Sequence, residues 1–208
     1  MNSSPSTDLS DLALKKMGKR CSCVWPIPLE PNQIQQVAKS SRKRKKVSGK
    51  KLTSNYPLIT TEQRESIPGR IFVSNRDAAK DSDLLTMLNV TAVMSIGAGK
   101  GGNHPGVLNF IHFGIKDRSN VDYLPVFHEA AEFAESIIAE ERNILVHCQG
   151  GMHRSPVVVA SLLIHFAGLS ALDAMECVKA ARPTADFSSH DGHLANQLQL
   201  YEAQLKEG

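Results

Sequence analysis

Cys148 and Arg154, which have five residues between them, are the pair with the clearest chemistry in this chain. A cysteine thiolate is a nucleophile, and an arginine guanidinium is a planar, permanently charged fork that matches phosphate oxygens. Ser155 follows directly and can offer its hydroxyl to the sulfur when the sulfur leaves in a second step. Together these residues predict attack on a phosphate ester through a covalent cysteine intermediate.

A strand and a helix are predicted to position this pair. Residues 144–146 are apolar and β-rich, which is typical of a buried strand that ends near Cys148. Gly150 and Gly151 let the following backbone turn sharply. Residues 156–167 then read as a buried helix that begins with proline. A loop of amides at a helix N-terminus holds an anion, and a thiol in that field loses its proton more easily.

The arrangement resembles the protein tyrosine and dual-specificity phosphatases, whose signature is His-Cys, five residues, Arg, then Ser or Thr. Residues 147–155 match that signature in full. The resemblance implies a phosphocysteine at Cys148, broken down with help from Ser155. It also implies that Arg154 binds the phosphoryl oxygens together with the loop amides, which belong to Gln149, Gly150, Gly151, Met152 and His153. We expect no metal or cofactor, because Arg154 and the amides supply the charge stabilisation.

A leaving alkoxide needs a proton, so the site should also contain an acid. In the family that this chain resembles, the general acid lies just after a strand, about as far before the cysteine as Asp117 lies before Cys148. Asp117 lies 31 residues before Cys148, after an alternating run at residues 108–115. Asp117 is therefore the expected acid. Asp122 is the reserve candidate, although it suits the start of the next helix better.

The expected substrate is a phosphoprotein carrying phosphotyrosine and phosphoserine or phosphothreonine. The loop interior, residues 149–153, contains no lysine, whereas relatives that cut phosphoinositides often carry lysines there. Three alternatives stay open on the same fold: an RNA 5′-phosphatase, a phosphoinositide phosphatase and a non-catalytic module that binds phosphoproteins. The last typically loses the cysteine, the arginine or the acid, and this chain has all three.

Strands alternate with helices along the second part of the chain, which predicts an α/β fold. The expected strands are 70–74, 90–96, 108–115 and 143–148. The expected helices are 78–88, 123–141, 157–167, 170–182 and 193–205. With the resemblance, this implies a phosphotyrosine-phosphatase-like domain over residues 65–208, with a central, mostly parallel or mixed sheet of about five strands flanked by helices.

Charge separates this domain from the N-terminal part. Residues 1–51 contain twelve Lys/Arg and three Asp/Glu, and few apolar positions recur periodically, so residues 1–64 are predicted to be a disordered basic tail. Residues 39–51 hold eight of the basic residues. Such a block is typical of nuclear-import signals, nucleic-acid patches and segments that bind anionic surfaces, so binding to nucleic acid stays open. We expect binding to an import receptor, or docking on an acidic groove of a kinase, and location in the nucleus, the cytoplasm or both. No run of eighteen apolar residues exists, so no membrane span is expected.

Three further motifs are weaker. Residues 97–102 match the spacing of a dinucleotide-binding loop, but no helix is predicted to follow, so a surface loop near the site is expected. His190 and His193 could suggest metal ligands, but turn residues surround them and no third ligand is evident. Cys177 could protect Cys148 as a disulfide, which sequence spacing alone does not decide.

Overall fold

The computed structural model describes residues 21–23, 70–98, 107–118 and 120–207. Within them lies a five-stranded sheet with the strand order β1-β2-β5-β3-β4. The strands are β1 (Cys21–Cys23), β2 (Ile71–Ser74), β3 (Val90–Ile96), β4 (Asn109–Phe113) and β5 (Asn143–His147). The four strands from β2 to β4 pair in parallel, and β1 pairs antiparallel with β2 at one edge. The predicted fold class, an α/β domain with a mostly parallel sheet, is confirmed.

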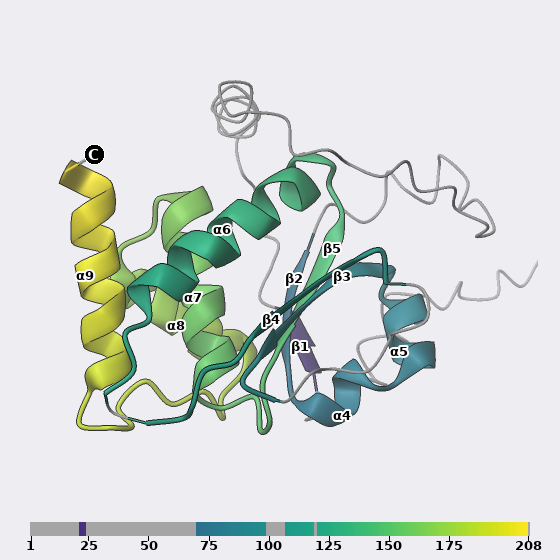
Figure 1. Cartoon of the computed structure of the whole chain (residues 1–208), viewed down its shortest axis with the longest axis horizontal. Helices are drawn as coiled ribbons and strands as arrows, with labels where there is room; N and C mark the ends of the chain where they lie inside the picture. The colour runs from purple at the N-terminus through teal and green to yellow at the C-terminus, as the bar shows by residue number, and fades with distance from the viewer. Residues whose placement is uncertain (1–20, 24–69, 99–106, 119, 208) are drawn as a thin grey trace, which may run out of the picture.

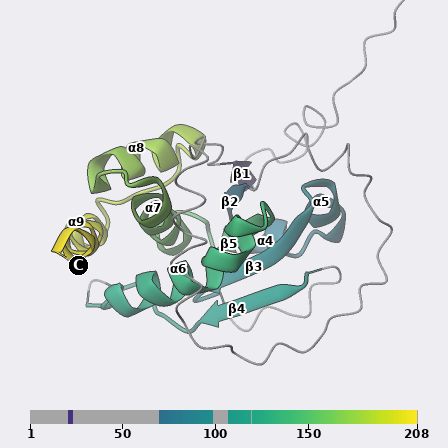
Figure 2. The same cartoon turned by 90° about the horizontal axis from the view of Figure 1, so that it is seen from above.

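Helices cover both faces of the sheet (Figure 1, Figure 2). The short helices α4 (Arg76–Ala79) and α5 (Ser82–Met87) pack on one face, around Phe72, Val93 and Leu145. The longer helices α6 (Leu124–Ala139), α7 (Arg154–Ala167), α8 (Ala171–Ala181) and α9 (His193–Glu207) gather on the other face. Burial on both faces explains why the central strands read as continuous apolar runs.

Helix α7 is the centre of the larger core. It is buried along nearly its whole length and is packed by α6, α8 and α9. Its sequence has no continuous polar face, as expected of a helix that other elements surround. Gly168 ends it with a left-handed backbone, φ 64°, as expected of a C-cap glycine. Because α7 begins at Arg154, this packing fixes the position of the residue that the sequence singled out.

The parallel register brings the loops that matter to one edge of the sheet. His147, the last residue of β5, lies between Ser74 of β2 and Ser95 of β3. Gly97 follows β3 directly, and β4 ends at Phe113, the register partner of Ile96. In α/β sheets, ligands bind where the carboxyl ends of parallel strands meet. Cys148, Gly97 and Asp117 therefore come from neighbouring loops at this edge.

The other predicted elements differ from the structure by at most a few residues at their ends, and two predictions were wrong. The single helix expected at 78–88 is two helices, because Asp81 interrupts it: the Asp81 side chain accepts a hydrogen bond from the Leu84 N–H and starts α5 as its N-cap. The strand expected at 108–115 is shorter, Asn109–Phe113.

The predicted tail contributes one described element. Cys21–Cys23 form β1, so this short piece belongs to the sheet and is not disordered as predicted; its backbone pairs with that of β2. The rest of residues 1–64, including the basic block 39–51, lies outside the described residues, and the domain boundary stays a prediction. No helix in the described ranges is both long and apolar enough to cross a membrane.

Candidate active site

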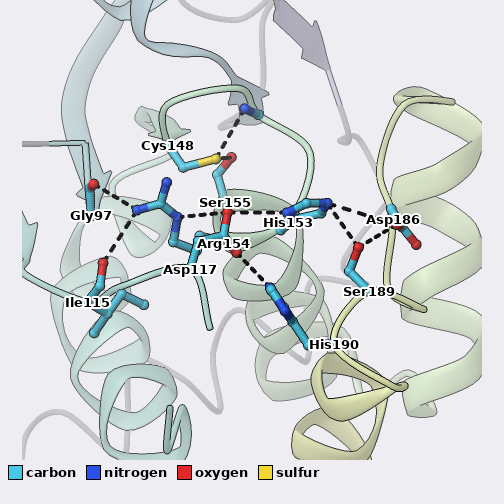
Figure 3. A network of polar contacts seen from close by, with 11 residues as sticks. Gly97, Ile115, Asp117, Cys148, His153, Arg154, Ser155, Asp186, Ser189 and His190 are labelled. Carbon is cyan, nitrogen blue, oxygen red and sulfur yellow. Dashed lines mark hydrogen bonds and ion pairs between the residues drawn. The ribbon is translucent and has the colours of Figure 1, made fainter. Parts of the chain in front are cut away.

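Cys148 lies at the start of a tight loop, residues 148–153, between β5 and α7 (Figure 3). Its side chain is buried, with 2% of the residue surface exposed. The sulfur lies 3.1 Å from the backbone N of Gly151 and 3.3 Å from the hydroxyl oxygen of Ser155, both of which can donate to it. Both donors lie at the N-terminus of α7, where unpaired N–H groups favour negative charge. The predicted nucleophile and the predicted assisting serine are therefore in contact.

Three groups hold the loop from outside: the Ser74 carbonyl, the backbone N–H of Arg76 and the side chain of Arg182. The carbonyl of Ser74 accepts from the Cys148 N–H at 3.4 Å and lies 3.3 Å from the Ser155 hydroxyl oxygen, whose single proton serves either this carbonyl or the Cys148 sulfur. The Arg76 N–H donates to the Gln149 carbonyl at 3.3 Å. Buried Arg182, from the end of α8, donates from Nε to the Gly151 carbonyl at 2.5 Å. With the Gln149 and Gly151 carbonyls bonded outward, the Gly151 amide is left to face the sulfur.

Gly151 is required where it stands. Its φ is 69°, and a Cβ there would lie 2.6 Å from Nη2 of Arg182 and 2.7 Å from the Ser74 carbonyl oxygen. Arg182 also donates from Nη2 to the Gly150 carbonyl at 3.3 Å. The sequence motif gives no sign of this support, because Arg182 lies 28 residues beyond Arg154. Its only signal in the sequence is an arginine at the end of a predicted helix, followed by proline.

Arg154 is held with part of its guanidinium turned toward the sulfur (Figure 3). Nη1 donates to the Gly97 carbonyl at 2.7 Å and lies 3.4 Å from the Ile115 carbonyl. Gly97 has φ 61°, and a Cβ there would collide with Nη1 of Arg154 and with the Ile115 oxygen. The first glycine of the 97–102 motif thus shapes the arginine site. Residues 99–106 lie outside the described ranges.

Asp117 lies at the mouth of the site. Its carboxylate is 3.5 Å from Nε of Arg154, 3.2 Å from Nδ1 of His153 and 3.1 Å from Nε2 of His190. Burial raises the pKa of Asp117, but hydrogen bonds to His190 and His153 and the Arg154 charge outweigh it, so the pKa lies below its ordinary value. Asp117 is therefore ionised without substrate. A phosphate dianion on Arg154 would offset that charge and favour the protonated form.

The other predicted candidates occupy different places. Asp122 accepts from the Leu124 N–H at 3.0 Å, so it serves the start of α6 and not the site. Met152 points outward, 45% exposed, at the rim of the loop. His193 contacts the Val121 carbonyl at 2.7 Å, apart from His190, which contacts Asp117. In the sequence, His190 and His193 could suggest one metal site, whereas the fold separates them and places His190 beside Asp117.

Comparison with known proteins identifies the family. Residues 71–204 match the family model described as dual specificity phosphatase, catalytic domain. The chain belongs to the dual specificity phosphatase family. This confirms the family that the signature around Cys148 resembles, and places the chain in the protein-tyrosine and dual-specificity phosphatase class.

Three relatives show how far the likeness to this family extends. Dual specificity protein phosphatase Mpk3 of Drosophila melanogaster is 30% identical over 144 residues, covering 68% of this chain and 34% of that protein, so this chain spans about a third of its length. Dual specificity protein phosphatase 1B of Arabidopsis thaliana is 28% identical over 136 residues, covering 65% of this chain and 80% of that one. The crystal structure of human DUSP28 superposes with a TM-score of 0.60 at 27% identity, covering 65% of this chain and 90% of that chain.

Proposed function

We propose that this chain is a cysteine-dependent protein phosphatase that hydrolyses phosphotyrosine and phosphoserine or phosphothreonine through a phosphocysteine at Cys148. The observation that carries the proposal is the contact of the Cys148 sulfur with the Gly151 amide and the Ser155 hydroxyl, at 3.1 and 3.3 Å, in a loop that ends at Arg154. Membership of the dual specificity phosphatase family supports the same reaction class.

In the first step the Cys148 thiolate attacks phosphorus, the sulfur–phosphorus bond forms and the bond from phosphorus to the substrate oxygen breaks. The loop amides and Arg154 bind the three equatorial oxygens, where charge is spread in the transition state. Nη1 of Arg154 is already bonded to the Gly97 carbonyl, so the rest of its fork serves the phosphoryl group. Protonated Asp117 gives its proton to the leaving alkoxide, and the free alcohol departs.

In the second step water attacks the phosphocysteine. Ionised Asp117 takes a proton from that water, and the sulfur–phosphorus bond breaks to release inorganic phosphate. The departing sulfur regains its negative charge, and the Ser155 hydroxyl, 3.3 Å away, stabilises it by hydrogen bonding. The products are one alcohol and one phosphate, and Asp117 then returns its proton to solvent, since it is ionised without substrate.

The substrate class is tested with a Cys148→Ser trap, since serine keeps the shape of the site but is a weak nucleophile. We expect the full chain with Cys148→Ser to retain phosphopeptides on affinity capture and wild-type chain to dephosphorylate them. Cys177→Ser is the matched control, because Cys177 is a partly buried thiol on α8 outside the loop. Hydrolysis of only RNA 5′ phosphates or only phosphoinositides, with phosphopeptides untouched, would contradict the proposed substrate.

We also propose that the basic block 39–51 binds an import receptor and gives the chain access to the nucleus as well as the cytoplasm. Its eight Lys/Arg support this. Replacing residues 42–46 by alanine should shift a fluorescent fusion from nucleus to cytoplasm. An unchanged distribution would refute it, and loss of kinase co-precipitation instead would favour kinase docking.

A further inference from the structure

The mouth of the site contains a cluster of metal-ligating side chains from three separate loops. Asp117 follows β4, His153 precedes α7, and His190 lies in the turn before α9 (Figure 3). One ligand atom from each lies within 4.8 Å of the other two. The two imidazole rings meet edge to face, 5.8 Å apart, with the Asp117 carboxylate bonded to both. All three side chains are a quarter to a third exposed, so an ion from solvent can reach them.

The spacing suits zinc. Zinc binds imidazole nitrogen at about 2.0–2.1 Å and carboxylate oxygen at about 2.0–2.2 Å, in a tetrahedron whose neighbouring ligand atoms are therefore about 3.3 Å apart. The observed separations are 3.2 Å from Nδ1 of His153 to Oδ2 of Asp117 and 3.1 Å from Nε2 of His190 to Oδ1, so each imidazole faces a different oxygen of the carboxylate. Two imidazoles and one carboxylate, with a fourth position open, are also a donor set that zinc accepts in proteins.

A second observation is a chain of polar contacts behind the His153 ring. The Ser189 hydroxyl donates to Asp186 at 2.5 Å, and its oxygen lies 3.0 Å from Nε2 of His153. This chain of contacts is the outer-shell support that orients a metal-binding histidine.

Nδ1 of His153 faces the Asp117 carboxylate at 3.2 Å, and Nε2 of His190 faces it at 3.1 Å. The geometry points to a regulatory site for a zinc-class divalent ion, held by Asp117, His153 and His190, that inhibits the enzyme by occupying its general acid. The inhibitory role rests on the proposed function; the binding site does not.

Arg154 limits the affinity of this site. Its Nε lies 3.5 Å from the same carboxylate, and its positive charge opposes a second cation. The site is therefore expected to bind an ion more weakly than the same three ligands would without this charge, and to release it, as a regulatory site must. A carboxylate held by the ion cannot carry a proton, so the ion should slow hydrolysis of alkyl phosphates more than that of nitrophenyl phosphate, whose leaving group needs no proton.

Binding is tested with Co²⁺ alone, added to the full chain carrying Cys148→Ser, and followed by visible absorption. We expect one ion per chain with tetrahedral bands. His190→Ala should weaken this binding beyond the roughly 10–100-fold typical for loss of an outer-shell partner. His128→Ala, which alters an exposed histidine on α6, is the matched control and should bind as before. Asp117→Asn in the same background provides a second variant if His190→Ala fails to fold by circular dichroism.

Unchanged cobalt bands in both His190→Ala and Asp117→Asn would overturn the site. So would a sulfur-to-cobalt charge-transfer band in place of the tetrahedral bands, since it would assign the ion to thiolates at Cys21, Cys23 or Cys177. Phosphatase activity of the metal-free wild type is measured separately. Activity without cluster-dependent binding overturns the metal site alone, whereas cluster-dependent binding without activity upholds the site and overturns the proposed function.

Discussion

Replacing Gly97 by alanine should disable the enzyme without touching any residue of the Cys148–Arg154 signature. The new Cβ would occupy the place of Nη1 of Arg154 and of the Ile115 oxygen. Moving either atom costs free energy, because Nη1 donates to the Gly97 carbonyl at 2.7 Å and the Ile115 oxygen belongs to the backbone. The guanidinium must therefore leave its position.

The expected size of the effect follows from what Arg154 supplies. Removing one preorganised donor to a developing charge costs about 10²–10³ in kcat, and we expect Gly97→Ala to lose that much. Alanine at φ 61° also costs about 1–2 kcal/mol in backbone strain, which should lower Tm. Vanadate affinity should fall together with kcat, because both depend on the same guanidinium.

Alanine substitutions at two other glycines separate the effect of backbone strain from the effect of displacing Arg154. Gly168→Ala introduces alanine at φ 64° with no atom within 4 Å of its Cβ, so it reports strain alone. Gly114→Ala, close to the site in sequence, has neither a positive φ nor a clash and should change nothing. Arg154→Lys combined with Gly97→Ala should cost little more than either change alone, since both remove one interaction. A folded Gly97→Ala enzyme with kcat/KM and vanadate affinity near wild type would refute the reasoning.

Other substitutions test the acid, the second step and the support of the loop. Asp117→Asn should lower kcat on alkyl phosphates by about 10²–10⁴ and on nitrophenyl phosphate far less; equal losses on both in steady-state assays would argue against an acid role. His190→Ala removes a hydrogen bond that lowers the pKa of Asp117, so that pKa should rise and the basic limb of the kcat/KM profile should move to higher pH; a shift to lower pH would contradict this. Ser155→Ala should slow breakdown of the phosphoenzyme, seen as a larger burst in rapid-quench kinetics, and a smaller burst would place its role elsewhere. Arg182→Met removes two buried hydrogen bonds from a charged donor, at about 1.5–3 kcal/mol each, and should lower both Tm and kcat, whereas exposed Lys206→Met should cost about 0–1 kcal/mol in chemical denaturation; equal stabilities would refute the bracing role.

The parts of the fold that the sequence predicted are those fixed by neighbours along the chain. The helix that became α7 was predicted to its last residue, Ala167, because it is apolar all round and is followed by glycine, and it begins at Arg154, two residues before the predicted start. The contact of Ser155 with Cys148 could be expected because both belong to one short motif. Asp81 divides the predicted helix because its side chain caps a new helix within an otherwise helical pattern. Local periodicity does not tell whether the cap or the continuous helix is more stable.

The parts that the sequence did not predict depend on contacts between distant segments. Gly97 supports Arg154 from 57 residues away, and Arg182 supports Gly151 from 31 residues away. His190 reaches Asp117 across 73 residues. Spacing within a motif carries no information on such pairs, because the fold decides which loops meet at the sheet edge. The pairing of Cys21–Cys23 with β2 is of the same kind, since backbone pairing leaves little trace in a three-residue sequence.

The most direct test of the central claim is to find the phosphate on the enzyme during turnover. The full-length chain is mixed with a radiolabelled phosphopeptide, quenched within the first turnover and digested, and the labelled fragment is sequenced by mass spectrometry. The account predicts label on Cys148 in wild type and in Cys177→Ser, and none in Cys148→Ser. Label on another residue, or full turnover by Cys148→Ser, would contradict it.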